Sequence, residues 1–245
     1  MVLQDRNMVL HGNPVTVVDW EFALLLKKIP AWLRTLEKVV QANLEYCDVK
    51  EMKKGAFPES LEDLVIHGQR IESGGLRLHP DSFEGLPNLQ RFEGGANKLN
   101  ENDMHPGLFA GATSLRHLQL CGNPEIRKFA ASELFPGGSN IMSFICLNFC
   151  GVSEGTDFQG LPNLETLDVG GAVHLPSRLF SGLCSLDSLL LDGVQPDAWG
   201  DDTFVGTTRC DSIHENVCAR QACNEQADVD SESKCECQRN PLCRG

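Results

Sequence analysis

Short apolar stretches with the same internal spacing recur along the chain. In one copy, Leu89, Phe92, Gly94, Asn97 and Leu99 follow one another at offsets of three, two, three and two positions. This alternation predicts a short β-strand with one buried face and one outward face. Equivalent stretches begin at Val39, Leu61, Leu115, Met142, Leu164 and Leu186. The chain therefore contains seven copies of one strand-forming pattern.

A second pattern, a phenylalanine followed two positions later by glycine, alternates with the first. Successive copies are 26, 26, 23, 22 and 24 residues apart. A period in this range indicates a repeat array, in which each unit buries its apolar face against its neighbours. The phenylalanines are Phe83, Phe109, Phe135, Phe158, Phe180 and Phe204, and Phe57 stands 26 residues before the first of them.

An eighth, less regular copy precedes the others. Residues 29–44 also carry apolar side chains three and four positions apart, which is typical of an amphipathic helix. Because Pro30 would interrupt such a helix, we favour a capping region or a degenerate repeat at the N-terminus. The residues of this eighth copy are Val15, Val18, Trp20, Ala23 and Leu25.

The repeated stretch resembles Leu-x-x-Leu-x-Leu-x-x-Asn-x-Leu, the strand signature of leucine-rich repeats of the extracellular type. The resemblance covers about residues 15–208. It implies an α/β fold: a leucine-rich repeat solenoid of about seven to eight repeats, shaped as a curved horseshoe. Its parallel β-sheet is expected on the concave face, with an irregular or short helical convex side. We divide the chain into an N-terminal capping region or degenerate repeat (1–38), the leucine-rich repeats (39–208) and a cysteine-rich disulfide segment (209–245).

The asparagine position of this signature varies between copies. It holds Cys47, Gln69, Asn97, Asn123, Cys150, Ala172 and Val194. The three side-chain amides are expected to form a ladder that satisfies backbone groups where the chain turns away from the sheet. At the two cysteines we expect buried thiols rather than disulfides. Alanine and valine cannot make these hydrogen bonds, so the ladder should be weaker toward the C-terminal end.

Residues between the leucines are expected to line the concave face. They are mostly polar with isolated apolar residues, as on an adaptable protein-binding surface. We predict Phe144, flanked by Arg91 and His117, as the anchor, because aromatic and arginine side chains dominate interface energetics. Any single residue could equally be an unselected solvent-facing one, so the prediction concerns the face as a whole. The candidate ligand-binding residues are Gln41, Asp63, His67, Arg91, Glu93, His117, Gln119, Phe144, Asn148 and Asp168.

Charge and composition narrow the choice of partner. The chain has 21 lysine and arginine residues against 34 acidic residues, a net charge of -13. This argues against nucleic acid or an anionic membrane as the principal partner. Hydrophobic residues make up 41% of the chain, enough to bury a sizeable core. No apolar run approaches the roughly 18 residues that a membrane-spanning helix needs.

Six of the eleven cysteines lie in the C-terminal segment. Such a density predicts disulfides formed in an oxidising compartment. A Cys-x-Cys near the end weakly resembles an epidermal-growth-factor-like module. The last interval is shorter than in that family, so a truncated module or an unrelated disulfide knot fits equally well. Paired Cys-x-x-Cys knuckles, as in many zinc sites, are absent from the sequence. The disulfide candidates are Cys210, Cys218, Cys223, Cys235, Cys237 and Cys243.

Sequence motifs for catalysis are absent. There is no nucleophile elbow, His-Glu-x-x-His motif, phosphate-binding loop or dinucleotide fingerprint, so we expect neither an enzyme nor a cofactor. Cys121 and Cys146, with His117 nearby, would need further ligands to hold a metal ion, and none is evident.

The N-terminus has neither the basic start nor the apolar stretch of a signal peptide, which conflicts with the disulfide prediction. We reconcile the two by expecting an N-terminally incomplete chain of an extracellular or cell-surface protein. The expected function is non-catalytic recognition of a protein or glycan by the concave face, as a fragment of a receptor or adhesion molecule. The alternative is an intracellular, cytoplasmic leucine-rich repeat scaffold with reduced cysteines.

Overall fold

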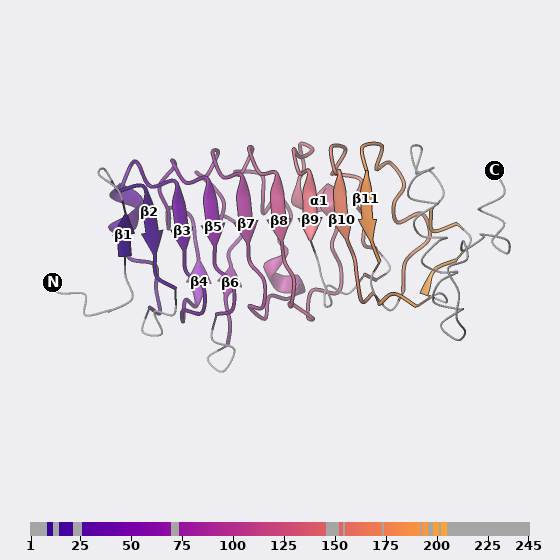
Figure 1. Ribbon diagram of the computed structural model, residues 1–245, viewed down its shortest axis with the longest axis horizontal. Helices are drawn as coiled ribbons and strands as arrows, with labels where there is room; N and C mark the ends of the chain where they lie inside the picture. Colours follow the sequence, from indigo (N-terminus) through magenta and orange to yellow (C-terminus); the bar gives the residue numbers. More distant parts are fainter. Residues whose placement is uncertain are drawn as a thin grey trace, which may run out of the picture.

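The computed structural model describes residues 9–11, 15–21, 26–69, 74–145, 152–153, 155–172, 174–191, 193–195, 198–200 and 202–204. Through these residues the chain winds in successive coils, and each coil adds one strand to the same sheet (Figure 1). In the described part of the chain, this main sheet has the order β1-β2-β3-β5-β7-β8-β9-β10-β11, and its neighbours are parallel from β2 onward. The strands are β1 (Val9–His11), β2 (Val17–Asp19), β3 (Gln41–Asn43), β5 (Asp63–Val65), β7 (Arg91–Glu93), β8 (His117–Gln119), β9 (Ser143–Ile145), β10 (Thr166–Asp168) and β11 (Ser188–Leu190).

The returning part of each coil contains little regular structure. Two strands of the coils, β4 (Glu51–Met52) and β6 (Arg77–Leu78), form a separate parallel pair below the main strands in Figure 1. The described helices are α1 (Ala131–Leu134) and short 3-10 helices at Leu33–Thr35 and Glu101–Asp103. None of them has the length and apolar character that crossing a membrane requires. The predicted solenoid, with a parallel sheet and a largely irregular opposite side, is confirmed.

The main sheet begins before the seven regular copies. β2 pairs in parallel with β3, so that Val18 lies beside Ala42. β1 runs antiparallel along the outer edge of β2 and covers that edge. The helical alternative for residues 29–44 is wrong, because the chain makes only a short 3-10 turn there. This turn starts where Leu33 N–H donates to the Pro30 carbonyl, and β3 follows it.

Neighbouring coils are joined tightly where each strand begins. The Glu62 carbonyl accepts hydrogen bonds from the N–H groups of both Gln90 (2.8 Å) and Arg91 (3.0 Å). The carbonyls of Thr16, Val40, Gln90, Arg116, Met142 and Glu165 accept a pair of hydrogen bonds from the following coil in the same way. Because a slip of one residue would turn every side chain to the other face of the sheet, this repeated contact determines which residues are buried.

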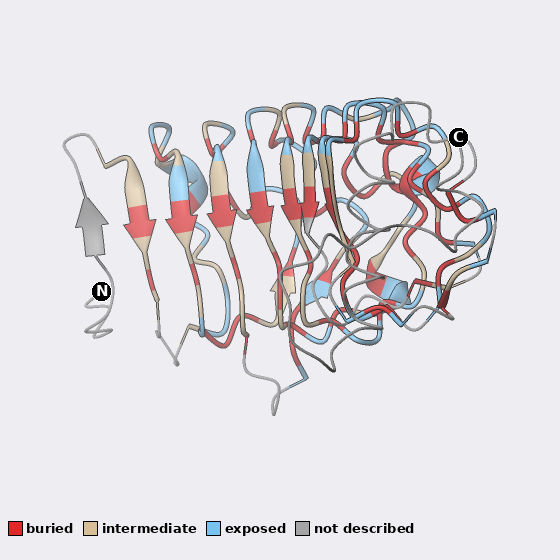
Figure 2. Cartoon of the chain, turned by 45° about the vertical axis from the view of Figure 1, so that its right-hand side comes forward, coloured by how far each residue is buried: buried red, intermediate tan, exposed pale blue. Residues whose placement is uncertain are grey.

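The core fills the space between the sheet and the returning segments. The middle residue of most main strands is buried, and Figure 2 shows this burial alternating along the strands. Phenylalanines of successive coils stack beneath the sheet. The Phe109 ring centroid lies 4.7 Å from that of Phe83 and 5.1 Å from that of Phe135. Each ring is therefore shielded by the neighbouring coils, as expected for a repeat array.

The fifth copy of the strand pattern starts one residue earlier than predicted. β9 aligns Phe144 with Leu118 of β8, so the copy begins at Ile141. Ile141 is fully buried, whereas Met142 is 36% exposed. Apolar residues occupy most positions in this window, so the spacing fits two frames one residue apart. The observed frame stacks Phe144 on Phe129, with 4.5 Å between ring centroids.

A ladder of buried amides runs through three coils on the side where the chain leaves the sheet. Asn97 Nδ2 donates to the Ile66 carbonyl (2.7 Å), and Asn97 Oδ1 accepts from Gln69 N–H (2.8 Å). Asn123 Oδ1 accepts in turn from Asn97 N–H (2.9 Å). One coil earlier, the Cys47 thiol donates to a backbone carbonyl in place of an amide. Each rung thus satisfies backbone groups of the preceding coil.

Asn97→Ala should lower the free energy of unfolding by about 3 kcal/mol, because it leaves buried backbone donors and acceptors without partners, at about 1–3 kcal/mol each. Urea denaturation followed by circular dichroism measures this change. Asn88→Ala is the matched control. Asn88 is exposed, and its amide donates to a backbone carbonyl at the surface. An Asn97 variant no less stable than the Asn88 variant would contradict a structural role for the ladder.

Candidate functional site

The outward face of the main sheet carries two rows of side chains, and we call it the outer face. In register, the first row is Gln41, Asp63, Arg91, His117, Ser143, Thr166 and Ser188. The second row includes Asn43, Val65, Glu93, Gln119, Asp168 and Leu190. Most of these side chains are partly or fully exposed, so the face is accessible along the described strands.

Two of the predicted residues are not surface groups. Phe144 is 1% exposed and packs in the core, so the prediction that it anchors a ligand is wrong. Its place in the first row belongs to Ser143, since the frame is shifted by one residue. Asp168 lies in the second row but is 4% exposed, and its carboxylate accepts a hydrogen bond from Gly170 N–H (2.9 Å). Asp168 therefore stabilises the turn after β10.

Other predicted residues cannot be placed. Asn148, Cys150 and the six cysteines of the C-terminal segment lie outside the described residues. The remaining candidates lie on β3, β5, β7 and β8 or in the turns that follow them.

Four charged or titratable side chains meet on adjacent strands of the outer face, and we call them the ionic cluster: Asp63, Arg91, Glu93 and His117. The Arg91 guanidinium donates to the Glu93 carboxylate, and its Nε lies 3.9 Å from Asp63 Oδ1. His117 Nε2 lies 3.8 Å from Glu93 Oε1. One arginine thus stands between two carboxylates, and Glu93 is shared with the imidazole. The parallel register brings these groups together, because strands of a sheet lie about 4.8 Å apart.

Partial burial changes the protonation of this cluster. Burial raises the pKa of Asp63 and outweighs the opposing effect of Arg91. Burial also lowers the pKa of His117, and the positive charge of Arg91 lowers it further, whereas Glu93 and Asp63 act in the opposite direction. The neutral forms of both groups are therefore favoured relative to water.

A second group of side chains surrounds Gly95 in the turn after β7. A Cβ atom at this glycine would lie 2.7 Å from His67 Nδ1 and 2.9 Å from Gln119 Oε1. These two polar atoms therefore converge above the glycine backbone. The Cys121 carbonyl oxygen lies 2.8 Å from the same point and Gly95 is buried, so these groups fill the space above the glycine. We call His67, Gly95, Gln119 and the Cys121 carbonyl the Gly95 contact. A residue with a side chain at position 95 would have to displace one of its members.

Tyr46 contacts His67 of the Gly95 contact and was missed by the sequence prediction. Its side chain is 41% exposed, and its ring contacts that of His67 edge to face, with 6.0 Å between centroids. The ring lies over Gly68, where a Cβ would approach it to 2.8 Å. Tyr46 N–H donates to the His67 carbonyl, so the turns stack like the strands. The repeat pattern assigns this position to a turn, and only its being the single tyrosine of the chain could have drawn attention to it.

Two buried oxygen atoms on the outer face have no hydrogen-bond donor among the described residues: Asp63 Oδ1 in the ionic cluster and Gln119 Oε1 in the Gly95 contact. A buried acceptor without a donor costs about 1–3 kcal/mol. Such groups are uncommon in folded proteins, and each calls for an explanation such as a bound water, an ion or local strain. The two atoms lie on nearby strands, which makes β5 to β8 the most distinctive part of the face.

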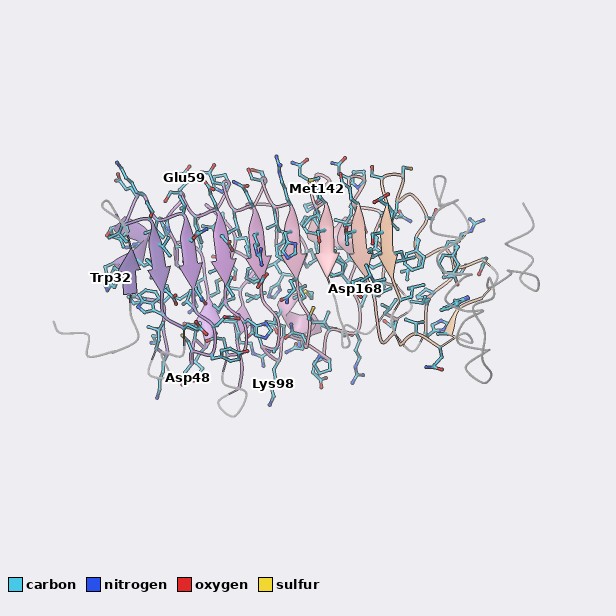
Figure 3. The ribbon with its side chains drawn as sticks, viewed as in Figure 1. Trp32, Asp48, Glu59, Lys98, Met142 and Asp168 are labelled. Atoms are coloured by element: carbon cyan, nitrogen blue, oxygen red, sulfur yellow. The ribbon has the colours of Figure 1, made fainter. Side chains whose placement is uncertain are left out.

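The outer face is made mostly of polar and charged side chains. The described residues contain no group of three or more histidine, cysteine or acidic side chains arranged to hold a metal ion. The side chains offer hydrogen bonds, charge and one exposed aromatic ring. In Figure 3, Glu59 and Met142 lie along the edge that precedes the strands, and Asp168 lies at the opposite end of β10. The Gly95 contact lies on the other side, because Gly95 follows the end of β7.

Comparison with known proteins supports the fold. The structure is similar to a chain in the solved structure of the Toll–Spätzle complex, described as a molecular hub in Drosophila development and innate immunity. The chains are 23% identical with a TM-score of 0.54, and the match covers 71% of this chain and 23% of that chain. This likeness shows a shared leucine-rich repeat fold and spans less than a quarter of the other chain. No protein-family model and no curated protein matches the sequence.

The pKa of His117, measured by NMR titration of its imidazole, should lie below its ordinary value of 6.5. Arg91→Gln should raise it, because this change removes a nearby positive charge. Between the lowered pKa and 6.5 the unfolded chain binds more protons than the folded one, so His117 should make the protein less stable as pH falls through this window.

Arg127→Gln is the matched control for charge, since Arg127 is exposed and does not lie in the main sheet. It should leave the His117 pKa unchanged. A His117 pKa at or above 6.5 in the unaltered protein would show that burial and Arg91 do not control it.

Proposed function

We propose that this chain is a non-catalytic recognition module that binds a protein ligand across the outer face of its main sheet. The observation that carries the proposal is the continuous register from β2 to β11. It sets polar, partly exposed side chains of successive coils side by side on one face.

The size of the face supports a macromolecular ligand. At about 4.8 Å per strand spacing, the parallel strands from β2 to β11 extend over about 34 Å. An extended segment of about ten residues has this length. The face contains an arginine and several hydrogen-bonding groups, and the turn after β3 adds the exposed Tyr46 beside it. Tyrosine and arginine are enriched at the centres of protein interfaces.

The similar fold in the Toll–Spätzle complex belongs to a complex between two named partners. This favours a protein over a glycan as the ligand class.

We also propose an extracellular or cell-surface location. The support is the sequence of the C-terminal segment, where six cysteines stand within residues 210–243. Cysteine-rich segments of this length fold with disulfides in oxidising compartments and rarely fold without them. The intracellular scaffold with reduced cysteines is the alternative.

The triple variant Asp63→Lys, Arg91→Glu and Glu93→Lys should lose the ligands that the unaltered protein selects from a displayed library of secreted proteins. It reverses the charges at the centre of the face, and like charges then oppose the partner. Enrichment of each library member, read by sequencing, measures the loss.

The matched control is Glu59→Lys, Arg116→Glu and Glu165→Lys. These residues are exposed, and the changes alter net charge by the same amount outside the two rows of the outer face. The control should keep the selected ligands. If both triple variants select the same ligands as the unaltered protein, the outer face is not the binding surface.

In protein produced through a secretory pathway, the tail cysteines should resist alkylation until a reductant is added. Peptide mapping by mass spectrometry after denaturation, with and without reductant, reads each cysteine of residues 210–243. Extensive modification without reductant would favour the intracellular alternative. A reduced sample serves as the control, because it shows that every tail peptide is detected.

A further inference from the structure

Tyr46 has an unusual backbone conformation for an aromatic residue. Its φ is 52°, in the left-handed region, where a bulky side chain crowds the backbone. In other described turns, the residue immediately before the position of the amide ladder also has a positive φ. These residues are Gly68, Ala96, Gly122, Gly171 and Gly193. Glycine adopts this conformation without strain, so most of these coils avoid the strain that Tyr46 carries.

The side chain of Tyr46 does not compensate for this strain by joining the core. It is 41% exposed, and among the described residues Met142 is the other large hydrophobic residue that is exposed. A single exposed hydrophobic residue is ordinary on a protein surface. An exposed aromatic residue on a strained backbone is not, because glycine at position 46 would avoid both the exposure and the strain. Strained residues cluster at active sites and ligand-binding sites.

The neighbouring coil holds the Tyr46 ring in place. Gly68 makes room for the ring, since a Cβ at this glycine would approach it to 2.8 Å. The His67 imidazole contacts the ring edge to face, and Tyr46 N–H donates to the His67 carbonyl at 2.9 Å. His67 belongs to the Gly95 contact, so Tyr46 adjoins the outer face. A ring held in this way loses little conformational freedom when a ligand covers it.

We propose that Tyr46 is a binding residue for the protein ligand of the outer face, and that the ligand places an apolar side chain against its exposed ring. This inference rests on the proposed function and specifies one contact of the partner. An apolar side chain is favoured because it buries ring carbon without removing a polar group from water. The contact adds apolar area beside a face whose two rows offer mainly hydrogen bonds and charge.

Tyr46 is the single tyrosine of the chain, which allows a direct test. Protein labelled with fluorotyrosine should give one fluorine NMR resonance, and this resonance reports position 46 alone. The probes are the secreted proteins that the unaltered chain selects from the displayed library. Each should shift or broaden the resonance on binding, because it covers the ring. A resonance that stays unchanged at saturating ligand would overturn the proposal.

Tyr46→Gly removes the ring and relieves the backbone strain. It should weaken binding of these ligands by about tenfold, measured by surface plasmon resonance, without lowering the midpoint of urea denaturation. Ala96→Gly is the matched control, because Ala96 has a φ of 53° at the equivalent position of another coil. This control should leave the affinity unchanged. Unchanged affinity of Tyr46→Gly would contradict the proposal, and the fluorine spectrum carries the test if this variant does not fold.

A double-mutant cycle tests the chemistry of the ligand. The apolar and aromatic residues of a selected ligand are replaced by alanine one at a time. At least one replacement should weaken binding to the unaltered chain severalfold but leave binding to Tyr46→Gly almost unchanged, because the contact is already lost there. Coupling between Tyr46 and only charged or polar residues of the ligand would show that the apolar assignment is wrong.

The outcomes separate this inference from the proposed function. If the charge-reversed triple variant loses the library ligands whereas Tyr46→Gly keeps them, the outer face is the binding surface and Tyr46 takes no part in binding. If the triple variant also keeps them, the outer face itself is wrong as the binding surface. A library that yields no ligand for the unaltered chain would overturn both.

Discussion

The structure depends on the shielding of each coil by the next. A single coil buries only the middle residue of its strand, a few returning apolar side chains and one phenylalanine, which is too little to offset the entropy of ordering more than twenty residues. Contact between coils supplies the missing burial: the Phe109 ring packs against the rings of Phe83 and Phe135 in the neighbouring coils. Stability therefore comes from the contact between coils, and a coil out of register would lose its own contacts and weaken those of both neighbours.

Hydrogen bonds at both ends of each strand fix its register. Where the strand begins, one carbonyl of each coil accepts two N–H groups of the next. Beyond its end, the side-chain amides of Gln69, Asn97 and Asn123 replace the backbone hydrogen bonds that the turning chain loses. Farther along the chain, Ala172 and Val194 hold the same position and cannot make such bonds. The coils at that end rely more heavily on apolar packing, for example between Phe180 and Phe204, 5.3 Å apart.

The same register creates the candidate binding surface. Arg91 contacts Glu93 because the two lie two residues apart on β7 and project from the same face. Arg91 also approaches Asp63 on the neighbouring strand β5, and His117 follows on β8. The stacked turns continue this alignment and bring Tyr46 over Gly68 and His67 beside Gly95. A stable scaffold thus holds charged and hydrogen-bonding groups close together, where partial burial shifts the pKa values of Glu45, Asp63 and His117 away from those in water. Groups held in this way are preorganised for a ligand, since little side-chain freedom remains to be lost on binding.

Spacing predicted the repeat array and its short strands, because these follow from local alternation repeated at a constant period. The resemblance to leucine-rich repeats then implied the solenoid with its parallel sheet and the amide positions of Asn97 and Asn123. The first-row positions of Asp63, Arg91 and His117 follow from the same alternation. Spacing failed at residues 141–145, where the apolar residues allow two frames and only packing against Leu118 and Phe129 selects one. The sequence pattern also could not predict three other features: the burial of Asp168, the contact of Tyr46 with His67 and the packing of side chains against Gly95. They depend on how far side chains reach between coils and on the path of each turn, and neither is encoded in the order of apolar and polar residues within a single repeat.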